Sequence, residues 1–170
     1  MHDQRFSKAV IYICVHDTDG AMGLVVNQLV NELTFPLLLR QLEIKSCENI
    51  QNIRIHFGGP VEVGRGFVLH SNEYSQKDTI IVDNYIGLTP TIDILRDIAE
   101  GNGPRQAILA LGYAGWGPGQ LEHELTQNAW LNVTADESLL FDIDLESKWK
   151  RSIKKLGIDP TLLSGDSGHA

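Results

Sequence analysis

Hydrophobic and polar positions along this chain follow the spacings of short strands and amphipathic helices. Apolar or alternating runs typical of strands lie at 9–15, 21–26, 53–57, 66–70, 79–82, 106–111 and 129–133. Helical spacing covers 34–42, a stretch from Thr89 or Thr91 to 101, 118–127 and 145–156. Strand pairs that alternate with helices predict a mixed β-sheet with helices on both faces, a three-layer sandwich at the border of the α/β and α+β classes.

Two features place strands within this sheet. His16-Asp17-Thr18-Asp19-Gly20 supplies turn residues between the first two runs, which predicts a hairpin. The run 106–111 is apolar on both alternating faces, which is typical of a strand buried on both sides. We therefore expect 106–111 at the centre of the sheet, and the hairpin argues against a purely parallel sheet.

The helical stretches predict which side chains face the core. In the first helix we expect Thr34 as the N-cap and Leu37, Leu38 and Leu42 facing inward. In the last, the stripe of Leu145, Trp149, Ile153 and Leu156 is the expected buried face. Five basic residues of that helix, namely Lys148, Lys150, Arg151, Lys154 and Lys155, are expected on the solvated side.

Two glycine-rich breaks interrupt the pattern. Gly112, Gly115, Gly117 and Gly119 predict a loop between the central strand and a helix, and Gly58-Gly59-Pro60 follows another strand. Glycine in such numbers costs backbone entropy, so it indicates a sharp path or a close approach of backbone. Our hypothesis is that the two breaks converge in space to form one recess.

Composition excludes several classes of function. A length of 170 residues with 42% hydrophobic and 21% charged residues suits one globular domain spanning 1–170. The net charge of −8 opposes general attraction to nucleic acid, so direct DNA binding is not expected. No apolar run approaches the roughly 20 residues of a membrane span. Cys14 and Cys47 have no metal-binding spacing, which favours a cytoplasmic protein.

Several stretches together resemble the YqgE/AlgH family of bacterial proteins. The matching residues are 7–14, 20–27, 58–61, 65–70, 111–122 and 128–131. The resemblance implies a compact mixed α/β fold in the bacterial cytoplasm, a label of transcriptional regulator carried by part of the family, and no established activity. Family members usually begin earlier, with an apolar strand that this chain is expected to lack. Gln28-Leu29 also stands where the family often has a basic residue followed by proline.

The two breaks and their polar neighbours define a candidate site. We expect a non-enzymatic binding or regulatory protein with no catalytic residue, cofactor or metal, and with an unknown protein or small-molecule partner. Solvated or capping roles are favoured for Glu122 and Glu124, with a hydrogen bond from one of these carboxylates to the Gly58-Gly59-Pro60 loop as the alternative. The proposed contact residues are Gly58, Gly59, Pro60, Arg65, His70, Gly115, Trp116, Gly117, Gln120, Glu122 and Glu124.

Two alternatives stay open. The first is a small-ligand or metal-assisted hydrolase that uses the same cleft, with His56 and His70 as two metal ligands. No third ligand stands at suitable spacing and catalytic zinc needs three, so hydrogen-bonded histidines are favoured. The second is nucleotide binding by the glycine loop. Its glycine spacing matches neither common phosphate-binding fingerprint, and Pro118 removes a backbone donor.

Overall fold

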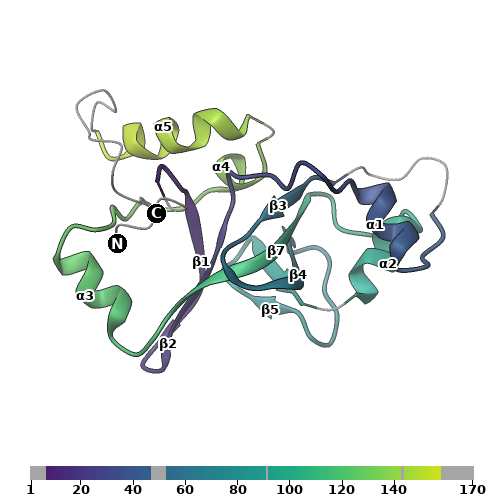
Figure 1. Cartoon of the computed structure of the whole chain (residues 1–170), viewed down its shortest axis with the longest axis horizontal. Helices are drawn as coiled ribbons and strands as arrows, with labels where there is room; N and C mark the ends of the chain where they lie inside the picture. Colours follow the sequence, from purple (N-terminus) through teal and green to yellow (C-terminus); the bar gives the residue numbers. More distant parts are fainter. Residues whose placement is uncertain (1–6, 47–52, 91, 143, 158–170) are drawn as a thin grey trace.

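The computed structural model describes residues 7–46, 53–90, 92–142 and 144–157 (Figure 1). Its strands are β1 (Ile11–Asp17), β2 (Gly20–Val25), β3 (Ile55–Phe57), β4 (Val61–Ser71), β5 (Ile80–Ile81), β6 (Ile86–Thr89) and β7 (Ala107–Trp116). Its helices are α1 (Phe35–Gln41), α2 (Asp93–Ala99), α3 (Gln120–Thr126), α4 (Glu137–Phe141) and α5 (Leu145–Lys155). None of the helices in these described ranges combines the length and apolarity that a membrane span requires.

The sheet is organised around β7, as the apolar run at its start predicts. Its strands lie in the order β1-β2-β7-β4-β6-β5, and β3 pairs with β7 in parallel while the other pairings are antiparallel. Along one edge of β7, β3 pairs with Leu109–Leu111 and β2 with 114–116. The opposite edge pairs with β4. The mixed sheet and the hairpin of β1 and β2 are confirmed.

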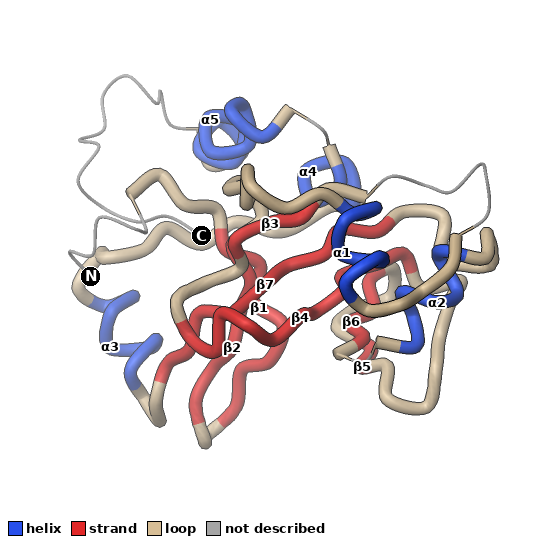
Figure 2. Tube along the Cα trace, turned by 45° about the vertical axis from the view of Figure 1, so that its right-hand side comes forward, coloured by secondary structure: helices blue, strands red, loops and turns tan. Residues whose placement is uncertain are grey.

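Helices cover both faces of the sheet, so the three-layer arrangement is also confirmed. On one face Ile108 and Ala110 pack in a core with residues of α4 and α5. On the opposite face Leu109 packs in a core with α1 and α2. A third core joins Trp116 to Leu121 of α3. Figure 2 shows α1 and α2 near β4 and β6, with α3 near β2 at the other end.

The prediction of a loop directly after the central strand is wrong for the first half of that segment, which is part of the strand. β7 continues through Gly112 and Gly115 to Trp116. Gly112 has a φ of 75°, a left-handed conformation that few other residues tolerate. The alternation of faces shifts there by one position, since Leu109 packs toward α1 and α2 while Tyr113 packs against the α4–α5 core. The glycine therefore adjusts the strand rather than ending it.

Other elements differ from the prediction. No strand forms at 129–133; Asn128 turns the chain at a φ of 58°, and Trp130 packs against Trp116 instead. β6 and α4 were not predicted. Thr89 ends β6 and does not start a helix, since α2 begins at Asp93. Thr91, the other predicted start, lies outside the described residues.

The cap of α1 is confirmed, but its buried face is only partly predicted. The Thr34 side chain accepts a hydrogen bond from the Leu37 backbone N–H at 3.4 Å. Phe35 and Leu39 are the buried residues, whereas Leu37 is 38% exposed. Leu38 and Leu42 are half-buried and pack against the α1–α2 core as predicted, whereas Leu37 is on the solvent side.

The predicted buried stripe of α5 is confirmed at its centre, but one of the basic residues predicted to lie in solvent is buried. Trp149 and Ile153 are buried, whereas Leu156 at the end is 37% exposed. Lys148, expected in solvent, is fully buried. Its Nζ donates to the carbonyl oxygens of Val26 at 2.9 Å and Leu140 at 2.7 Å. Two carbonyl partners compensate part of the cost of burying an ammonium group, and burial lowers the pKa of Lys148 to about 8.

Candidate functional site

The two glycine breaks do converge, and they do so by backbone contact. A Cβ built on Gly59 would stand 2.1 Å from the Tyr113 carbonyl carbon, and one on Gly58 would stand 2.3 Å from the Gly112 oxygen. A Cβ on Gly112 would stand 2.3 Å from the Gly59 oxygen. We call Gly58, Gly59 and Gly112 the packed glycine junction. Because backbone fills the space between these segments, they form no recess there, and this part of the hypothesis is corrected. Pro60 follows the junction and leads into β4.

Trp116 is a buried anchor for α3. Its indole Nε1 donates to Glu124 Oε1 at 3.3 Å, and Nε1 of Trp130 donates to the same oxygen at 2.8 Å. The two rings meet edge to face at 5.9 Å. Gln120 Nε2 donates to the other oxygen, Oε2, at 2.9 Å. Trp130 was missed because its segment was interpreted as a strand.

Glu124 is thus engaged with the two indoles and Gln120, and Glu122 pairs with His16 at the end of β1. Neither carboxylate bonds the Gly58 segment, so the alternative in which one of them joins the two glycine segments is wrong. The two glutamates lie two positions apart and leave a short helix in different directions. His16 was not predicted as a site residue, and only its position at a strand end marked it.

The loop Gly117-Pro118-Gly119, here the open glycine loop, is not packed in this way. The nearest atom to a Cβ on Gly117 would be Gln120 Oε1, at 3.9 Å, and for Gly119 it would be Glu122 Oε2, at 3.8 Å. Gly119 has a φ of 74°, a left-handed conformation that explains why a glycine stands at this position. Gly117 does not have a positive φ. The side chains of His16 and Glu122 beside the loop are 41% and 49% exposed. This part of the predicted site is open to solvent.

Gly115 and Arg65 have separate surroundings. A Cβ on Gly115 would meet the ring of Tyr113 at 3.3 Å, a tight contact. Arg65 is exposed in the irregular part of β4, where its guanidinium lies 5.1 Å from the ring centroid of Phe67 and 3.6 Å from Glu62. Arg65 therefore interacts with its own strand and not with the Trp116 network.

His70 is a buried structural histidine. Its Nδ1 lies 2.9 Å from the Ser71 carbonyl oxygen and its Nε2 lies 2.7 Å from Thr89 Oγ1. A carbonyl can only accept, so Nδ1 carries the proton and the Thr89 hydroxyl donates to Nε2. Burial lowers the pKa of His70. The side chain is fully buried and has no free nitrogen for a ligand.

His56 is buried on the other face of the sheet. It pairs in register with Ala110, which belongs to the α4–α5 core, and its Nδ1 lies 3.3 Å from the Arg54 carbonyl oxygen. Its Nε2 has no hydrogen-bond partner among the described residues. Burial, reinforced by the charge of Lys148, lowers the pKa of His56 to about 4.

The two histidines cannot share a metal ion. β7 lies between β3 and β4, and His56 and His70 face opposite sides of the sheet. Within the described ranges, no group of three or more His, Cys, Asp or Glu side chains is placed to hold a metal. The proposed two-histidine site is therefore wrong, because the topology separates the strands that carry it.

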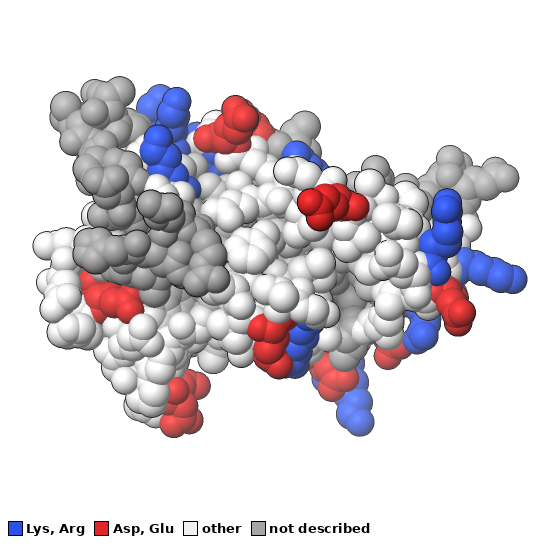
Figure 3. All heavy atoms as spheres, viewed as in Figure 1, with Lys and Arg blue, Asp and Glu red and all other residues white. Residues whose placement is uncertain are grey.

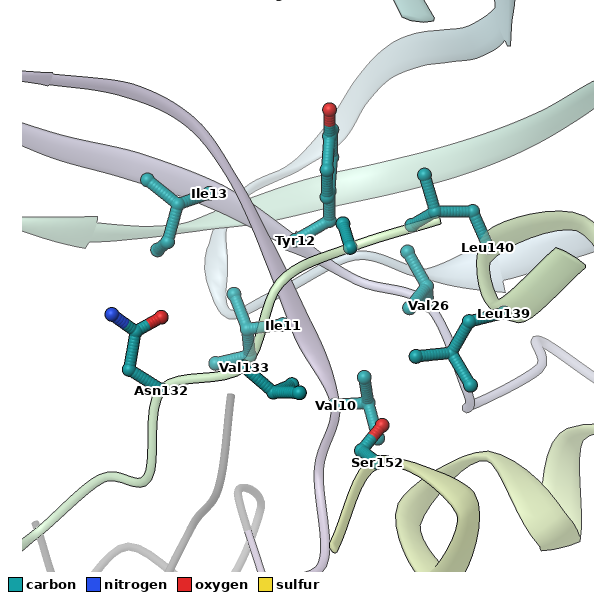
Figure 4. Close-up of a pocket in the computed structure, with 11 residues that line it drawn as sticks. Val10, Ile11, Tyr12, Ile13, Val26, Asn132, Val133, Leu139, Leu140 and Ser152 are labelled. Carbon is teal, nitrogen blue, oxygen red and sulfur yellow. The ribbon is translucent and has the colours of Figure 1, made fainter. Parts of the chain in front are cut away.

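A cavity of about 170 Å³ lies between β1 and the α4–α5 layer (Figure 4). Its walls include Ile11 of β1, Val133 of the segment between α3 and α4, and Leu139 of α4, with Ser152 of α5 at one side. The Tyr12 hydroxyl is directed elsewhere, because it donates to Asp83 Oδ2 at 2.9 Å. The cavity is thus mainly apolar, with Asn132 and Ser152 as polar lining residues, and the Ser152 hydroxyl donates to the Lys148 carbonyl oxygen at 2.8 Å.

The basic residues of α5 do not form a uniform positive patch. Arg151 pairs with Asp142 at 2.6 Å and Lys155 with Asp136 at 2.7 Å, and Lys148 is buried. Figure 3 shows basic side chains over α5 with acidic ones close beside them. Local acids therefore offset much of the charge of this helix.

Sequence and structure comparisons agree with this architecture. The AlgH-like family model matches residues 1–161. A UPF0301 protein of Rhodopseudomonas palustris strain BisB18 is 52% identical over 178 residues, covering 100% of this chain and 84% of the relative. The UPF0301 protein Rru_A3059 of Rhodospirillum rubrum is 49% identical over 170 residues, covering 100% of this chain and 88% of the relative.

Two solved structures have the same fold. The solution structure of the AlgH protein from Pseudomonas aeruginosa is 40% identical with a TM-score of 0.79, covering 100% of this chain and 90% of that one. Protein DIP2367 from Corynebacterium diphtheriae is 16% identical with a TM-score of 0.70, covering 91% of this chain and 80% of that one. At this low identity the likeness concerns the fold alone. With the family model and these relatives spanning essentially the whole sequence, the chain belongs to the AlgH-like family.

Proposed function

We propose that this chain is a binding or regulatory protein without catalytic activity of its own, and that it contacts its partner through the open glycine loop. The proposed surface contains Gly115, Gly117, Gln120 and Glu122, joined by His16. One observation supports it most: Gly117 is a glycine for which neither packing nor backbone conformation accounts. Since glycine costs backbone entropy, its presence there favours close approach by another molecule.

The chemistry of this surface suits a polar partner. Glu122 and His16 are about half exposed beside the loop. Gly117 is exposed as well, although its N–H donates to Gln120 Oε1 at 2.9 Å. The hydrogen bond between the buried Trp116 and the half-buried Glu124 holds α3 in place behind these residues. The other predicted contacts, Gly58, Gly59, Pro60, Arg65 and His70, lie outside this surface.

The proposal includes a cytoplasmic location and, in agreement with the label carried by part of the family, a role in regulating transcription. Contact with another protein fits this role better than contact with DNA, because the net charge of −8 repels a phosphate backbone. Gel-shift binding to DNA that persists at about 200 mM salt would argue for direct DNA contact instead.

The competing proposal is a small-ligand or metal-assisted hydrolase. With His56 and His70 on opposite faces, a metal would need other ligands. Elemental analysis of the purified protein separates the two proposals. Stoichiometric zinc or manganese would favour the hydrolase, whereas capture of a partner through the open glycine loop would favour the binder.

The test compares three variants for partner capture from a lysate of the source bacterium. Gly117→Val places a branched side chain on the loop and Glu122→Gln removes its charge, while Gly64→Ala changes an open glycine elsewhere. We expect the first two to lose partners that the wild type and Gly64→Ala retain, with unchanged thermal unfolding. Equal capture by all four proteins would refute the proposed surface.

A further inference from the structure

A groove of about 220 Å³ lies at the other end of the molecule, between the paired helices α1 and α2 and the strands β4 and β7. Figures 1 and 2 both show α1 and α2 side by side there. Its floor is made by Val68, Leu95 and Leu109, which are all buried. Leu38 and Leu42 form one wall, and Pro90 and Ile92 belong to the other. The groove is thus an indentation in the α1–α2 core that opens to solvent.

Two glycines of β4 leave this space empty. A Cβ on Gly66 would stand 3.5 Å from Leu109 Cδ1 and 3.7 Å from Leu111 Cδ2, which are ordinary contacts, and one on Gly64 would meet nothing within 4 Å. Neither glycine has a positive φ. Packing and backbone conformation would therefore admit side chains at both positions. Glycine inside a strand weakens it and often marks a bulge or a place where a ligand or another backbone approaches. The pairing of β4 with β7 is irregular between Val61 and Gly66, so the glycines support a binding site together with the open groove beside them.

The charges around the groove restrict what can occupy it. Among the described residues that line it, Arg65 alone is charged, and its guanidinium lies over Phe67 and near Glu62. Phe67 belongs to the α4–α5 core, on the opposite face of the sheet from Val68. No charge is therefore directed into the groove. An ionised group placed there would lose its hydration without gaining a partner, and this cost favours an uncharged ligand.

We infer that this groove is a binding site for a small, uncharged apolar molecule, of a size between a benzene ring and a two-ring aromatic. An apolar cavity of about 150 Å³ is sufficient to bind benzene, so the larger groove accommodates a somewhat bigger ligand. This site is distinct from the open glycine loop and does not depend on the function proposed for that loop. It gives the chain a second means of recognition, based on shape and hydrophobicity.

The experiment uses indole as the neutral probe and indole-3-carboxylate as its charged counterpart. Each is titrated into the methyl-labelled full chain, and the NMR signals of Leu109, Leu111 and Val68 are followed. We expect indole to shift these methyl signals, and the carboxylate to bind at least about tenfold more weakly, which corresponds to about 1.4 kcal/mol. Equal binding of both probes, or shifts confined to other parts of the molecule, would overturn the inference.

Matched glycine variants locate the site. Gly66→Leu fills the groove without removing an existing contact, and it should abolish the indole shifts while thermal stability is kept or raised. Gly66→Ala narrows the groove by one methyl group and gives a graded result if the leucine variant does not fold. Gly64→Ala, at the open margin, should retain binding. Indole binding that survives in both Gly66 variants would contradict the inference. Partner capture through Gly117 is a separate measurement, so the two proposals can fail independently.

Discussion

The packed glycine junction and the open glycine loop contain the same residue type for different physical reasons. At Gly58, Gly59 and Gly112, any added Cβ would stand within 2.4 Å of backbone, so only glycine permits the two segments to touch. At Gly117 the nearest atom to an added Cβ would be 3.9 Å away, and it belongs to a flexible side chain. The first region therefore uses glycine to build the sheet. The second has glycine without any internal need, which indicates an external one.

The largest effect should come from the junction. Gly59→Ala forces a Cβ to within 2.2 Å of the Tyr113 oxygen at a φ of 153°, so we expect a loss of roughly 3 kcal/mol or more in the free energy of unfolding. Urea denaturation measures it, with Gly64→Ala as the control that should change stability by less than about 0.5 kcal/mol. Comparable stabilities for the two variants would erase the distinction between packed and open glycines.

Acid should loosen the junction before it affects the open loop. His56 lies two residues before Gly58, and its pKa of about 4 is below the ordinary 6.5. The unfolded chain therefore binds this proton more readily than the folded one. Stability from His56 is present above pH 6.5 and is lost as the pH falls toward 4, by about 3 kcal/mol at most.

The measurement is urea denaturation across that pH range for the wild type and His56→Gln, with amide exchange at Gly58 and Gly117 as a local readout. The variant should show a weaker dependence on pH, and exchange in the wild type should rise first at Gly58. An identical pH profile for the two proteins would show that His56 does not titrate in this way.

A smaller loss is expected at the anchor behind the open loop. Glu124→Met leaves the indole N–H groups of Trp116 and Trp130 without their shared acceptor, which should cost roughly 2 kcal/mol. Glu122→Met removes only an exposed pair with His16, so less than about 0.5 kcal/mol is expected. Tryptophan fluorescence follows both unfolding curves. If Glu122→Met were the more damaging change, the assignment of anchor and surface would be reversed.

The smallest effect on stability should be at Gly117 itself. Gly117→Ala adds a methyl group into open space, so the free energy of unfolding should change by less than about 0.5 kcal/mol in either direction. Partner affinity should fall nonetheless. A large destabilisation, measured by urea denaturation, would mean that Gly117 has a structural role after all.

Much of the fold could be predicted from sequence because local patterns determine it. The hairpin of β1 and β2, the Thr34 cap and the central position of Ala107–Leu111 all follow from turn residues, a capping side chain and a doubly apolar run. The predictions that depend on contacts distant in sequence were less accurate. Trp130 packs on Trp116, so the apolar run at 129–133 does not enter the sheet.

Sequence patterns predicted the candidate site less well, for the same reason. Lys148 was expected in solvent as a basic residue, yet the carbonyl groups of Val26, directly after β2, and of Leu140 in α4 allow it to be buried. The packed and open glycines are indistinguishable along the sequence, because the difference lies in what surrounds them. Only the fold shows that a Cβ on Gly59 would collide with Tyr113, whereas a Cβ on Gly117 would meet no atom closer than 3.9 Å.

Site-specific photocrosslinking tests the contact surface most directly. A benzophenone amino acid is introduced at position 117 in one protein and at position 64 in another, and both are irradiated in cells. The account predicts a discrete covalent adduct from position 117 that is absent from position 64 and is lost when Glu122→Gln is added. No adduct from position 117, or the same adduct from both positions, would contradict it.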